Sequence, residues 1–170
     1  MQGSGFIVRD IGLLTNYHVT DNNEIYTVNT YKGEKKCCVS NEMNLIKNNE
    51  SIDYACYLYG KTSEDALELG NSDELDIGSE VLVIGYPDYC TGNSPEIQHV
   101  NIISQRPFMG QKIFTISGRI VHGASGGVVL NMSYQVVGVI RCGPVTLKET
   151  ESNSLQGFIP INEIVNDLMA

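Results

Sequence analysis

Short apolar segments separated by turns run through the whole chain. The first two, Phe6-Ile7-Val8 and Gly12-Leu13-Leu14-Thr15, are separated by three residues, which is typical of a β-hairpin. The segments that follow are short and rich in β-branched and aromatic side chains, which favours further strands. We expect these strands at 25–28, 36–39, 53–59, 80–84, 98–104, 112–117, 127–130, 135–140 and 157–160.

Only the end of the chain has the spacing of a helix, because Ile164, Val165 and Leu168 fall on one face of residues 162–169. Many short strands without alternating helices predict an all-β fold. A polar, acidic stretch over 64–77 divides the strands into two groups. We therefore expect one domain over residues 1–170. Its parts would be an N-terminal barrel over about 1–65, a connection over about 66–78, a C-terminal barrel over about 79–160 and a helix over about 161–169.

Composition and charge narrow the class of protein. The chain is 42% hydrophobic and 18% charged with seventeen glycines, which is typical of a soluble globular protein. Its apolar runs are much shorter than the roughly 18 residues that span a bilayer. The formal net charge of −9 argues against nucleic-acid and membrane partners, since these are bound mainly through clustered Lys and Arg.

The cysteines and the first residues predict a cytoplasmic setting. Five cysteines are an odd number, so at least one has no partner within the chain, and free thiols are the simpler interpretation. The start Met1-Gln2-Gly3-Ser4 lacks the pattern of a secretory signal. The adjacent Cys37 and Cys38 have no Cys-x-x-Cys or His-rich partner, so we expect neither a metal site nor a cofactor.

One glycine-rich segment contains a candidate nucleophile, Ser125 in Gly123-Ala124-Ser125-Gly126-Gly127. Glycines let the backbone turn tightly and let neighbouring N–H groups converge on one point. A serine nucleophile also needs an imidazole to take its proton. The chain has three histidines, His18, His99 and His122. The segment fits the Gly-x-Ser-x-Gly elbow of α/β-hydrolases too, but there a histidine follows the serine, and none follows Ser125.

The available order is His18, Asp53, Ser125, which is the order in chymotrypsin-like enzymes. A subtilisin-like order with Asp10 first is open on spacing but needs an α/β fold. Asp10 and Asp21 are the alternatives to Asp53 as the acidic residue. We expect the other two histidines to be structural or to lie at the rim of the site.

The flanking residues resemble the trypsin-like serine proteases, most closely their HtrA-like branch. Gly12-Leu13-Leu14-Thr15-Asn16-Tyr17-His18-Val19 resembles the family's histidine motif, and Asp53-Tyr54-Ala55-Cys56-Tyr57-Leu58 resembles its aspartate motif. The segment from Gly123 to Asn131 resembles the nucleophile motif. Segments 69–87 and 157–161 resemble the inter-barrel connection and the closing strand. The motifs occur in the family's order and cover nearly the whole chain.

The resemblance implies a chymotrypsin-like fold of two antiparallel Greek-key β-barrels with a short C-terminal helix. It implies a catalytic triad of His18, Asp53 and Ser125, with the N–H groups of Gly123 and Ser125 as the oxyanion hole. The strand over 138–143 would pair with an extended substrate. The expected substrate-binding residues are Arg119, Ile120, His122, Ile140, Arg141, Cys142, Gly143 and Phe158.

Some residues depart from the family or leave alternatives open. Ala124 stands where chymotrypsin-like zymogens have an aspartate, so we do not expect activation by a newly cut N-terminus. The family also has one strand more before the histidine hairpin. Ile120 and Ile140 favour a medium apolar substrate side chain, whereas Arg119 favours an acidic one.

Two functions of different class follow. The first is a serine endopeptidase acting on protein or peptide substrates. It would be the protease part of a larger intracellular protein and could contact that protein's other domains or subunits. The second is a catalytically silent protease-fold module that binds peptides or other partners.

Overall fold

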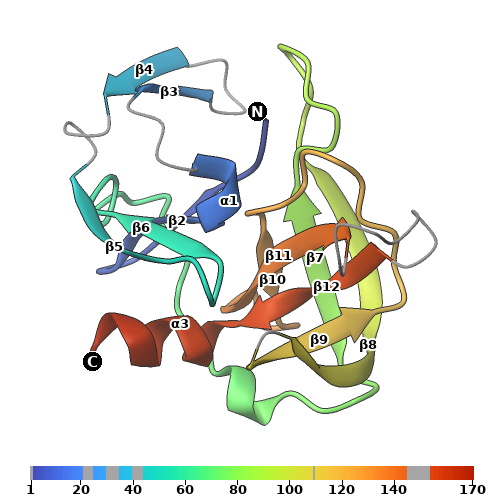
Figure 1. The fold of residues 1–170 in the computed structure, drawn as a ribbon. Coiled ribbons are helices and arrows are strands. Elements are labelled where there is room, and N and C mark those ends of the chain that lie inside the picture. The colour runs from blue at the N-terminus through green and yellow to red at the C-terminus, as the bar shows by residue number, and fades with distance from the viewer. Residues whose placement is uncertain (1, 21–24, 30–34, 40–43, 109, 145–153) are drawn as a thin grey trace.

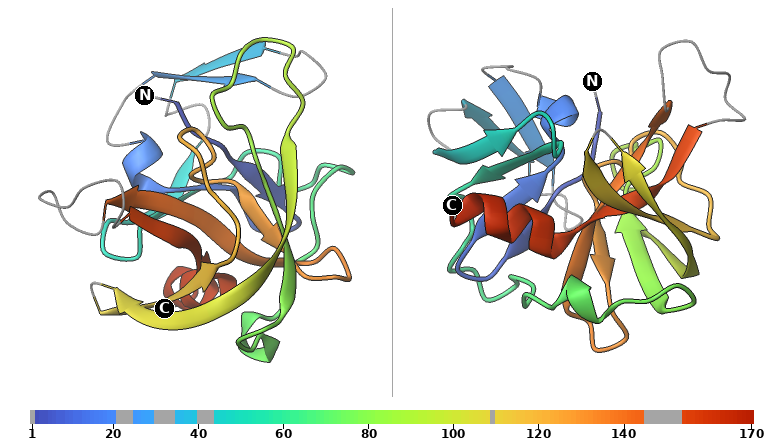
Figure 2. Two further views of the ribbon diagram at one scale, coloured as in Figure 1. Left: turned by 90° about the vertical axis from the view of Figure 1, so that its right-hand side faces the viewer. Right: turned by 60° about the horizontal axis from the view of Figure 1, so that its bottom comes forward.

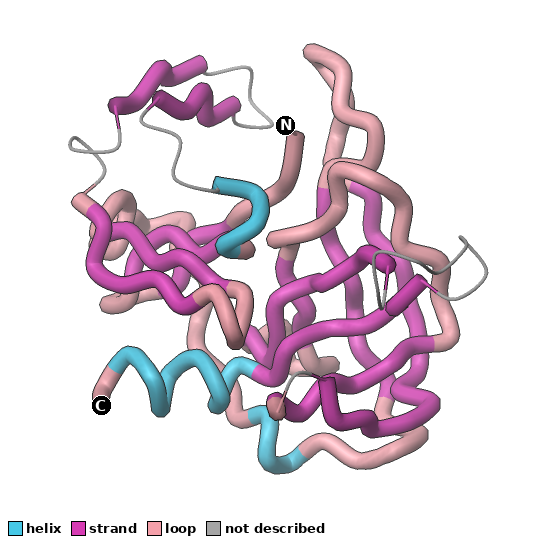
Figure 3. The backbone as a smooth tube through the Cα atoms, in the orientation of Figure 1, coloured by secondary structure: helices cyan, strands magenta, loops and turns pink. Residues whose placement is uncertain are grey.

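The computed structural model describes residues 2–20, 25–29, 35–39, 44–108, 110–144 and 154–170. Two strand-rich halves lie side by side, and a C-terminal helix, α3 (Ile161–Leu168), leaves the second half and runs beneath the first (Figure 1). Strands dominate both halves, and helices are short (Figure 3). Within this part of the chain, no helix is both long and apolar enough to cross a membrane.

The first half contains a four-stranded antiparallel sheet with the order β1-β2-β6-β5. Its strands are β1 (Phe6–Val8), β2 (Gly12–Thr15), β5 (Leu45–Asn49) and β6 (Tyr54–Tyr57). The predicted hairpin is confirmed, with Phe6 paired to Leu14. A separate two-stranded ribbon is formed by β3 (Ile25–Asn29) and β4 (Lys35–Val39).

The second half is a closed antiparallel barrel with the order β7-β8-β9-β12-β11-β10, in which β10 also pairs with β7. Three consecutive strands with the fourth returning beside the first make a Greek key. The strands are β7 (Glu80–Gly85), β8 (Glu96–Phe108), β9 (Gln111–Ile116), β10 (Val128–Leu130), β11 (Val136–Pro144) and β12 (Ser154–Pro160). The left panel of Figure 2 shows the barrel from its outer side.

The prediction of an all-β fold in two strand-rich halves with a short C-terminal helix is confirmed. Over the residues described, the first half consists of the four-stranded sheet and the separate ribbon. Strand β5 was not expected, because Lys47, Asn48 and Asn49 have low strand propensity and the strand lies at an exposed edge. The single helical turn α1 (Tyr17–Thr20) was not expected either, since four residues are too few for a periodic pattern.

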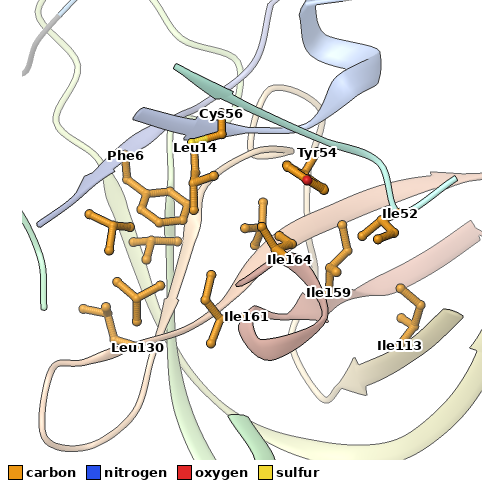
Figure 4. Packing of buried hydrophobic residues seen from close by; sticks show 14 residues of the cluster. Phe6, Leu14, Ile52, Tyr54, Cys56, Ile113, Leu130, Ile159, Ile161 and Ile164 are labelled. Carbon is orange, nitrogen blue, oxygen red and sulfur yellow. The ribbon is translucent and has the colours of Figure 1, made fainter. Parts of the chain in front are cut away.

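One hydrophobic cluster joins the two halves (Figure 4). Phe6 and Leu14 come from the first sheet, Leu130 and Ile159 come from the barrel, and Ile164 comes from α3. Burying each of these side chains stabilises the fold by about 1.5–3 kcal/mol. Because both halves contribute to one cluster, this packing fixes the seam between them.

The connection between the halves is fastened to both of them. Leu67 forms a bridge with Val8 of the first sheet, and Leu69 forms one with Val136 of the barrel. A short 3-10 helix, η1 (Ser72–Glu74), follows, and its Ser72 Oγ accepts the backbone N–H of Asn162 at 3.0 Å. The acidic connection is therefore held in place by contacts with both halves.

Candidate active site

His18 lies in α1, directly after β2, and pairs with Asp53. His18 Nδ1 is 2.8 Å from Asp53 Oδ2 and 3.1 Å from Oδ1, and the backbone N–H of His18 donates to Oδ1 at 3.0 Å. The Asp53 side chain is 4% exposed, whereas that of His18 is 43% exposed. A carboxylate that holds Nδ1 leaves Nε2 of an accessible ring as the nitrogen that can exchange a proton.

The backbone of Asp53 is fixed as well as its carboxylate. Its φ is +69°, in the left-handed region that Asp tolerates better than most residues. Its N–H donates to the Asn49 carbonyl at 2.8 Å, and its own carbonyl accepts Asn16 Nδ2 at 3.0 Å. Asn16 is fully buried. These contacts fix the position of the Asp53 backbone, and therefore the position from which its side chain extends toward His18.

Ser125 lies in a tight loop before β10, and Ser4 of the first half holds this loop. The Ser4 N–H donates to the Ser125 carbonyl at 2.8 Å, and Ser4 Oγ donates to the Gly123 carbonyl at 2.7 Å. Gly123 and Gly126 have φ of +93° and +87°, which glycine alone adopts readily. A Cβ at Gly126 would collide with the Ser4 carbonyl and with Thr15 Oγ1. Glycine is therefore required at Gly126, because any side chain there would collide with its neighbours.

Two carbonyl groups are bound within the protein in the loop over residues 122–127, which we call the nucleophile loop after the candidate nucleophile Ser125. The His122 carbonyl accepts the Asp88 N–H at 2.9 Å, and the Ala124 carbonyl accepts the Gly127 N–H at 3.0 Å, just before β10. In a trans peptide the following N–H points the opposite way. The N–H groups of Gly123 and Ser125 thus point away from these two partners.

The same contacts bring the segments of His18 and Ser125 together. Thr15 Oγ1 donates to the Ser4 carbonyl at 2.7 Å, and Thr15 lies three positions before His18. Ser4 in turn binds the loop of Ser125. The histidine turn and the nucleophile loop therefore share one hydrogen-bonded support at the seam.

The barrel also reaches Asp53 directly. The Gly126 N–H donates to the Ile140 carbonyl at 3.0 Å, and the next residue on β11 is Arg141. Arg141 Nε lies 3.1 Å from Asp53 Oδ2. The neighbourhood of Ser125 and the Asp53 carboxylate are thus connected through two adjacent residues of one strand.

The other expected substrate-binding residues differ in burial. Ile120 and Ile140 are buried and line one small pocket that also includes Val121 and Ala124. Arg119 and His122 are exposed. The apolar pair is therefore brought together, whereas the two polar side chains face solvent.

Cys142 and Gly143 continue β11 beyond Ile140 and pair with Gln156 and Leu155 of β12. The Cys142 side chain lies outside the described part of the structure. Phe158 is fully buried, and its ring centroid is 5.4 Å from that of Phe114 inside the barrel. Its side chain is therefore part of the barrel core and is not exposed at the surface.

The other acidic, histidine and cysteine residues considered from the sequence lie away from His18 or outside the residues that the structure describes. Asp10 is exposed in the β1–β2 turn, at the opposite end of the hairpin from His18. Asp21 lies outside the described residues, as do the side chains of Cys37 and Cys38. His99 is exposed on β8 with Nε2 3.4 Å from Met132 Sδ. The described residues contain no group of three or more His, Cys, Asp or Glu side chains that could hold a metal ion.

Two contacts at the site were not predicted from the sequence, although Arg141 itself was expected there as a substrate-binding residue. Ser4 supports the nucleophile loop, and the Gly-Ser-Gly segment around it was the only signal in the sequence. Arg141 was expected beside the substrate, but its side chain binds Asp53. No sequence pattern marks that contact, since it depends on the register of β11 across the seam.

A family model described as "Trypsin-like peptidase domain" matches residues 3–139, which include His18, Asp53 and Ser125. The chain belongs to the trypsin-like peptidase domain family. The resemblance inferred from the sequence motifs is therefore confirmed, and the closed Greek-key barrel with a second sheet agrees with the chymotrypsin-like fold.

The chain is also similar to two named serine proteases. The serine protease Rv3671c of Mycobacterium tuberculosis (strain H37Rv) is 25% identical over 158 residues, 88% of this chain and 38% of that protein. The serine protease Do-like HtrA of Lactococcus lactis subsp. lactis is 25% identical over 182 residues, 97% of this chain and 43% of that protein. The chain thus spans less than half the length of these relatives.

Solved structures share the fold of this trypsin-like domain. The HtrA-type protease AlgW with a tripeptide matches with a TM-score of 0.79 and 22% identity, covering 98% of this chain and 54% of that one. The Rv3671c protease in its inactive form matches with a TM-score of 0.73 and 19% identity, covering 98% of this chain and 82% of that one.

Proposed function

We propose that this chain is a serine endopeptidase domain that hydrolyses peptide bonds through Ser125, His18 and Asp53. The observation that carries the proposal is the pairing of His18 Nδ1 with the buried Asp53 carboxylate at 2.8 Å. The segment of His18 is joined to the loop of Ser125 through Thr15 and Ser4. Membership in the trypsin-like peptidase domain family supports the same chemistry.

The proposed reaction follows from the roles of the three side chains. Ser125 Oγ attacks the carbonyl carbon of the scissile bond while His18 Nε2 takes the hydroxyl proton. Asp53 keeps the proton of neutral His18 on Nδ1 and stabilises the imidazolium that forms. His18 then gives the proton to the leaving amine, and an acyl-enzyme remains on Ser125. A water molecule, deprotonated by His18, hydrolyses this ester and restores the hydroxyl.

The negative oxygen of the tetrahedral intermediate would be stabilised by the N–H groups of Gly123 and Ser125. Their preceding carbonyls are bound inside the protein, which supports this assignment. Loss of one such donor raises the barrier by about 3 kcal/mol. Since the donors are backbone groups, the loop geometry held by Ser4 is what this step depends on.

The substrate would bind as an added strand beside β11. From Arg141 to Pro144 this strand pairs with β12 on one edge, whereas β10 pairs with it only before that point. Over the described residues, the second edge of this segment carries no paired strand. An exposed edge gives an extended peptide main-chain hydrogen bonds next to the nucleophile.

The setting of the domain is also proposed. Because the named relatives are more than twice as long as the matched region, we propose that the domain acts as part of a longer protein. The odd number of cysteines favours free thiols, and on that ground we propose an intracellular setting. Expression of the longer chain with a compartment marker tests this placement.

Turnover of a fluorescently labelled unfolded protein by the purified chain tests the activity. We expect cleavage that is lost in Ser125→Ala and in His18→Ala, and retained in Ser94→Ala, whose serine is exposed on the loop before β8. Peptide binding without cleavage in the folded wild-type chain would favour the silent binding module instead.

A further inference from the structure

The Asp53 carboxylate has a second partner besides His18, the cationic guanidinium of Arg141. Arg141 Nε lies 3.1 Å from Oδ2, the oxygen that also lies 2.8 Å from His18 Nδ1. Arg141 belongs to the barrel, whereas Asp53 and His18 belong to the first half. The contact therefore crosses the seam at the point where the reaction would occur.

Arg141 is fixed on its other side by an aromatic ring. Its side chain is 18% exposed, and its guanidinium carbon lies 4.3 Å from the ring centroid of Phe108, the last residue of β8. A guanidinium over an aromatic face is attracted by the ring, and more strongly when water is excluded. The side chain is thus held between the ring and the carboxylate.

The charges in this cluster balance only when Arg141 is included. The Asp53 side chain is 4% exposed, and a buried carboxylate is costly unless a cation pairs with it. His18 must be neutral in the resting enzyme to act as a base, so it supplies a hydrogen bond but no charge. Arg141 supplies the positive charge in that state.

The donors around Asp53 also determine how its carboxylate is rotated. The His18 backbone N–H binds Oδ1, and Arg141 binds Oδ2. Together they hold Oδ2 toward Nδ1 of the imidazole. Without Arg141, rotation about the Asp53 side chain would be restrained by His18 alone, and the imidazole would lose part of its own orientation.

We propose that Arg141 is a positioning residue of the triad, which neutralises Asp53 in the resting enzyme and thereby orients His18 toward Ser125. The inference rests on the proposed function and deepens it. It gives the Arg141 side chain a different role from the substrate contact expected from the sequence, while the Arg141 backbone stays on the substrate edge of β11.

The test compares Arg141→Ala, Arg141→Lys and the matched control Arg106→Ala, whose arginine is exposed on β8 of the same barrel. We expect Arg141→Ala to lower kcat by about 10²-fold with KM unchanged, since a small misplacement of a catalytic group has effects of this size. Lysine restores the charge but not the planar fork, so Arg141→Lys should recover part of kcat. The control should behave as wild type.

A second readout follows the His18–Asp53 pair without turnover. The ¹H NMR resonance of the His18 Nδ1 proton, identified by its loss in His18→Ala, should be present in wild type, Arg106→Ala and Arg141→Lys. It should broaden or disappear in Arg141→Ala. If Arg141→Ala does not fold, Arg141→Lys decides: a lowered kcat with unchanged KM supports the proposal, and a raised KM with unchanged kcat contradicts it.

The two proposals fail in different ways. A folded Arg141→Ala variant with wild-type kcat and an unchanged Nδ1 resonance would overturn the role of Arg141, although the protease would stand. A wild-type chain that shows the Nδ1 resonance but cleaves nothing would overturn the proposed function. In that case, the His18 Nδ1 proton resonance in the Arg141 variants would still show whether Arg141 orients Asp53.

Discussion

The backbone N–H of Ser4 donates a 2.8 Å hydrogen bond to the carbonyl oxygen of Ser125. The Ser4 hydroxyl adds two more contacts, because it donates to the Gly123 carbonyl at 2.7 Å and accepts the Tyr86 N–H at 2.9 Å. One residue near the start of the chain therefore shapes a loop that lies 119 positions later in the sequence. Residues outside the motifs of His18, Asp53 and Ser125 contribute to the geometry of the candidate site in this way.

Replacing Ser4 by alanine should loosen the nucleophile loop. The change leaves a buried carbonyl and a backbone N–H without this partner, which costs about 1–3 kcal/mol. We expect the free energy of unfolding in urea to fall by that amount and kcat to fall with it. Ser94→Ala is the control. A variant with wild-type stability and wild-type kcat would show that the Ser4 hydroxyl is dispensable.

Replacing Asp53 by asparagine should remove most of the activity without unfolding the chain. Asparagine tolerates the left-handed backbone at this position but does not stabilise the imidazolium, and kcat should fall by about 10⁴-fold, as in other enzymes with this triad.

Asp10→Asn is a closely matched control, because Asp10 has a φ of +63°, similar to the +69° of Asp53, and is exposed. Steady-state kinetics of both variants make the comparison. Equal losses of kcat in the two variants would contradict the assignment of Asp53.

The packing of α3 against the first half should depend on Tyr54. The Tyr54 hydroxyl donates to the Asp167 carboxylate in α3, and burial raises the pKa of Tyr54, which keeps the hydroxyl protonated. Tyr54→Phe removes this bond to a charged acceptor, and we expect a loss of about 1.5–3 kcal/mol in urea unfolding. Tyr134→Phe, at a 68% exposed tyrosine, should change nothing. Equal stability of both variants would contradict this role.

The same contact predicts a pH dependence of stability. The hydrogen bond from Tyr54, with smaller contributions from Asn49 and Lys47, lowers the pKa of Asp167 despite the opposing effect of burial. A carboxyl whose folded pKa lies below its unfolded value of about 3.9 stabilises the fold above that pH. This contribution is lost as the pH falls through the folded pKa.

The stability difference between wild type and Asp167→Asn should therefore be largest above about pH 4 and should shrink at lower pH. Urea unfolding at several pH values measures this difference. Asp65→Asn, at an exposed aspartate, should show no such trend. A difference between wild type and Asp167→Asn that grows on acidification would contradict the assignment.

Two described cysteines should react differently with thiol reagents. Burial raises the pKa of Cys56 to about 11, whereas Cys90 is free and exposed. Because the thiolate is the reactive form, iodoacetamide at about pH 8 should alkylate Cys90 and leave Cys56 unmodified in the folded chain. Peptide mass spectrometry, with urea-unfolded protein as the control, reads both sites. Equal modification of both in the folded chain would contradict the buried position of Cys56.

The sequence predicted those parts of the fold that local patterns determine. The β1–β2 hairpin, the strand at Glu80–Gly85 and the last helix follow from hydrophobic alternation and spacing. Strand β5 could not be predicted, because its residues are polar and its pairing with β6 is set by tertiary structure. Whether strands close a barrel likewise depends on pairings that no local pattern reveals.

In the candidate site, too, some features could be predicted from the sequence and others could not. His18, Asp53 and Ser125 could be selected from the sequence, because few histidines exist and the glycine pattern marks one serine. The contacts of Ser4 with Gly123 and of Arg141 with Asp53 could not, since each joins residues far apart in the chain. Such contacts become visible only when the two halves are packed.

The central claim is that His18 and Asp53 activate the Ser125 hydroxyl as a nucleophile. Reaction of the folded chain with a fluorophosphonate probe, mapped by peptide mass spectrometry, tests it most directly. We predict one adduct on Ser125 that is absent in Ser125→Ala and greatly slowed in His18→Ala and Asp53→Asn. No adduct on the folded wild-type chain, or an adduct on another residue, would contradict it.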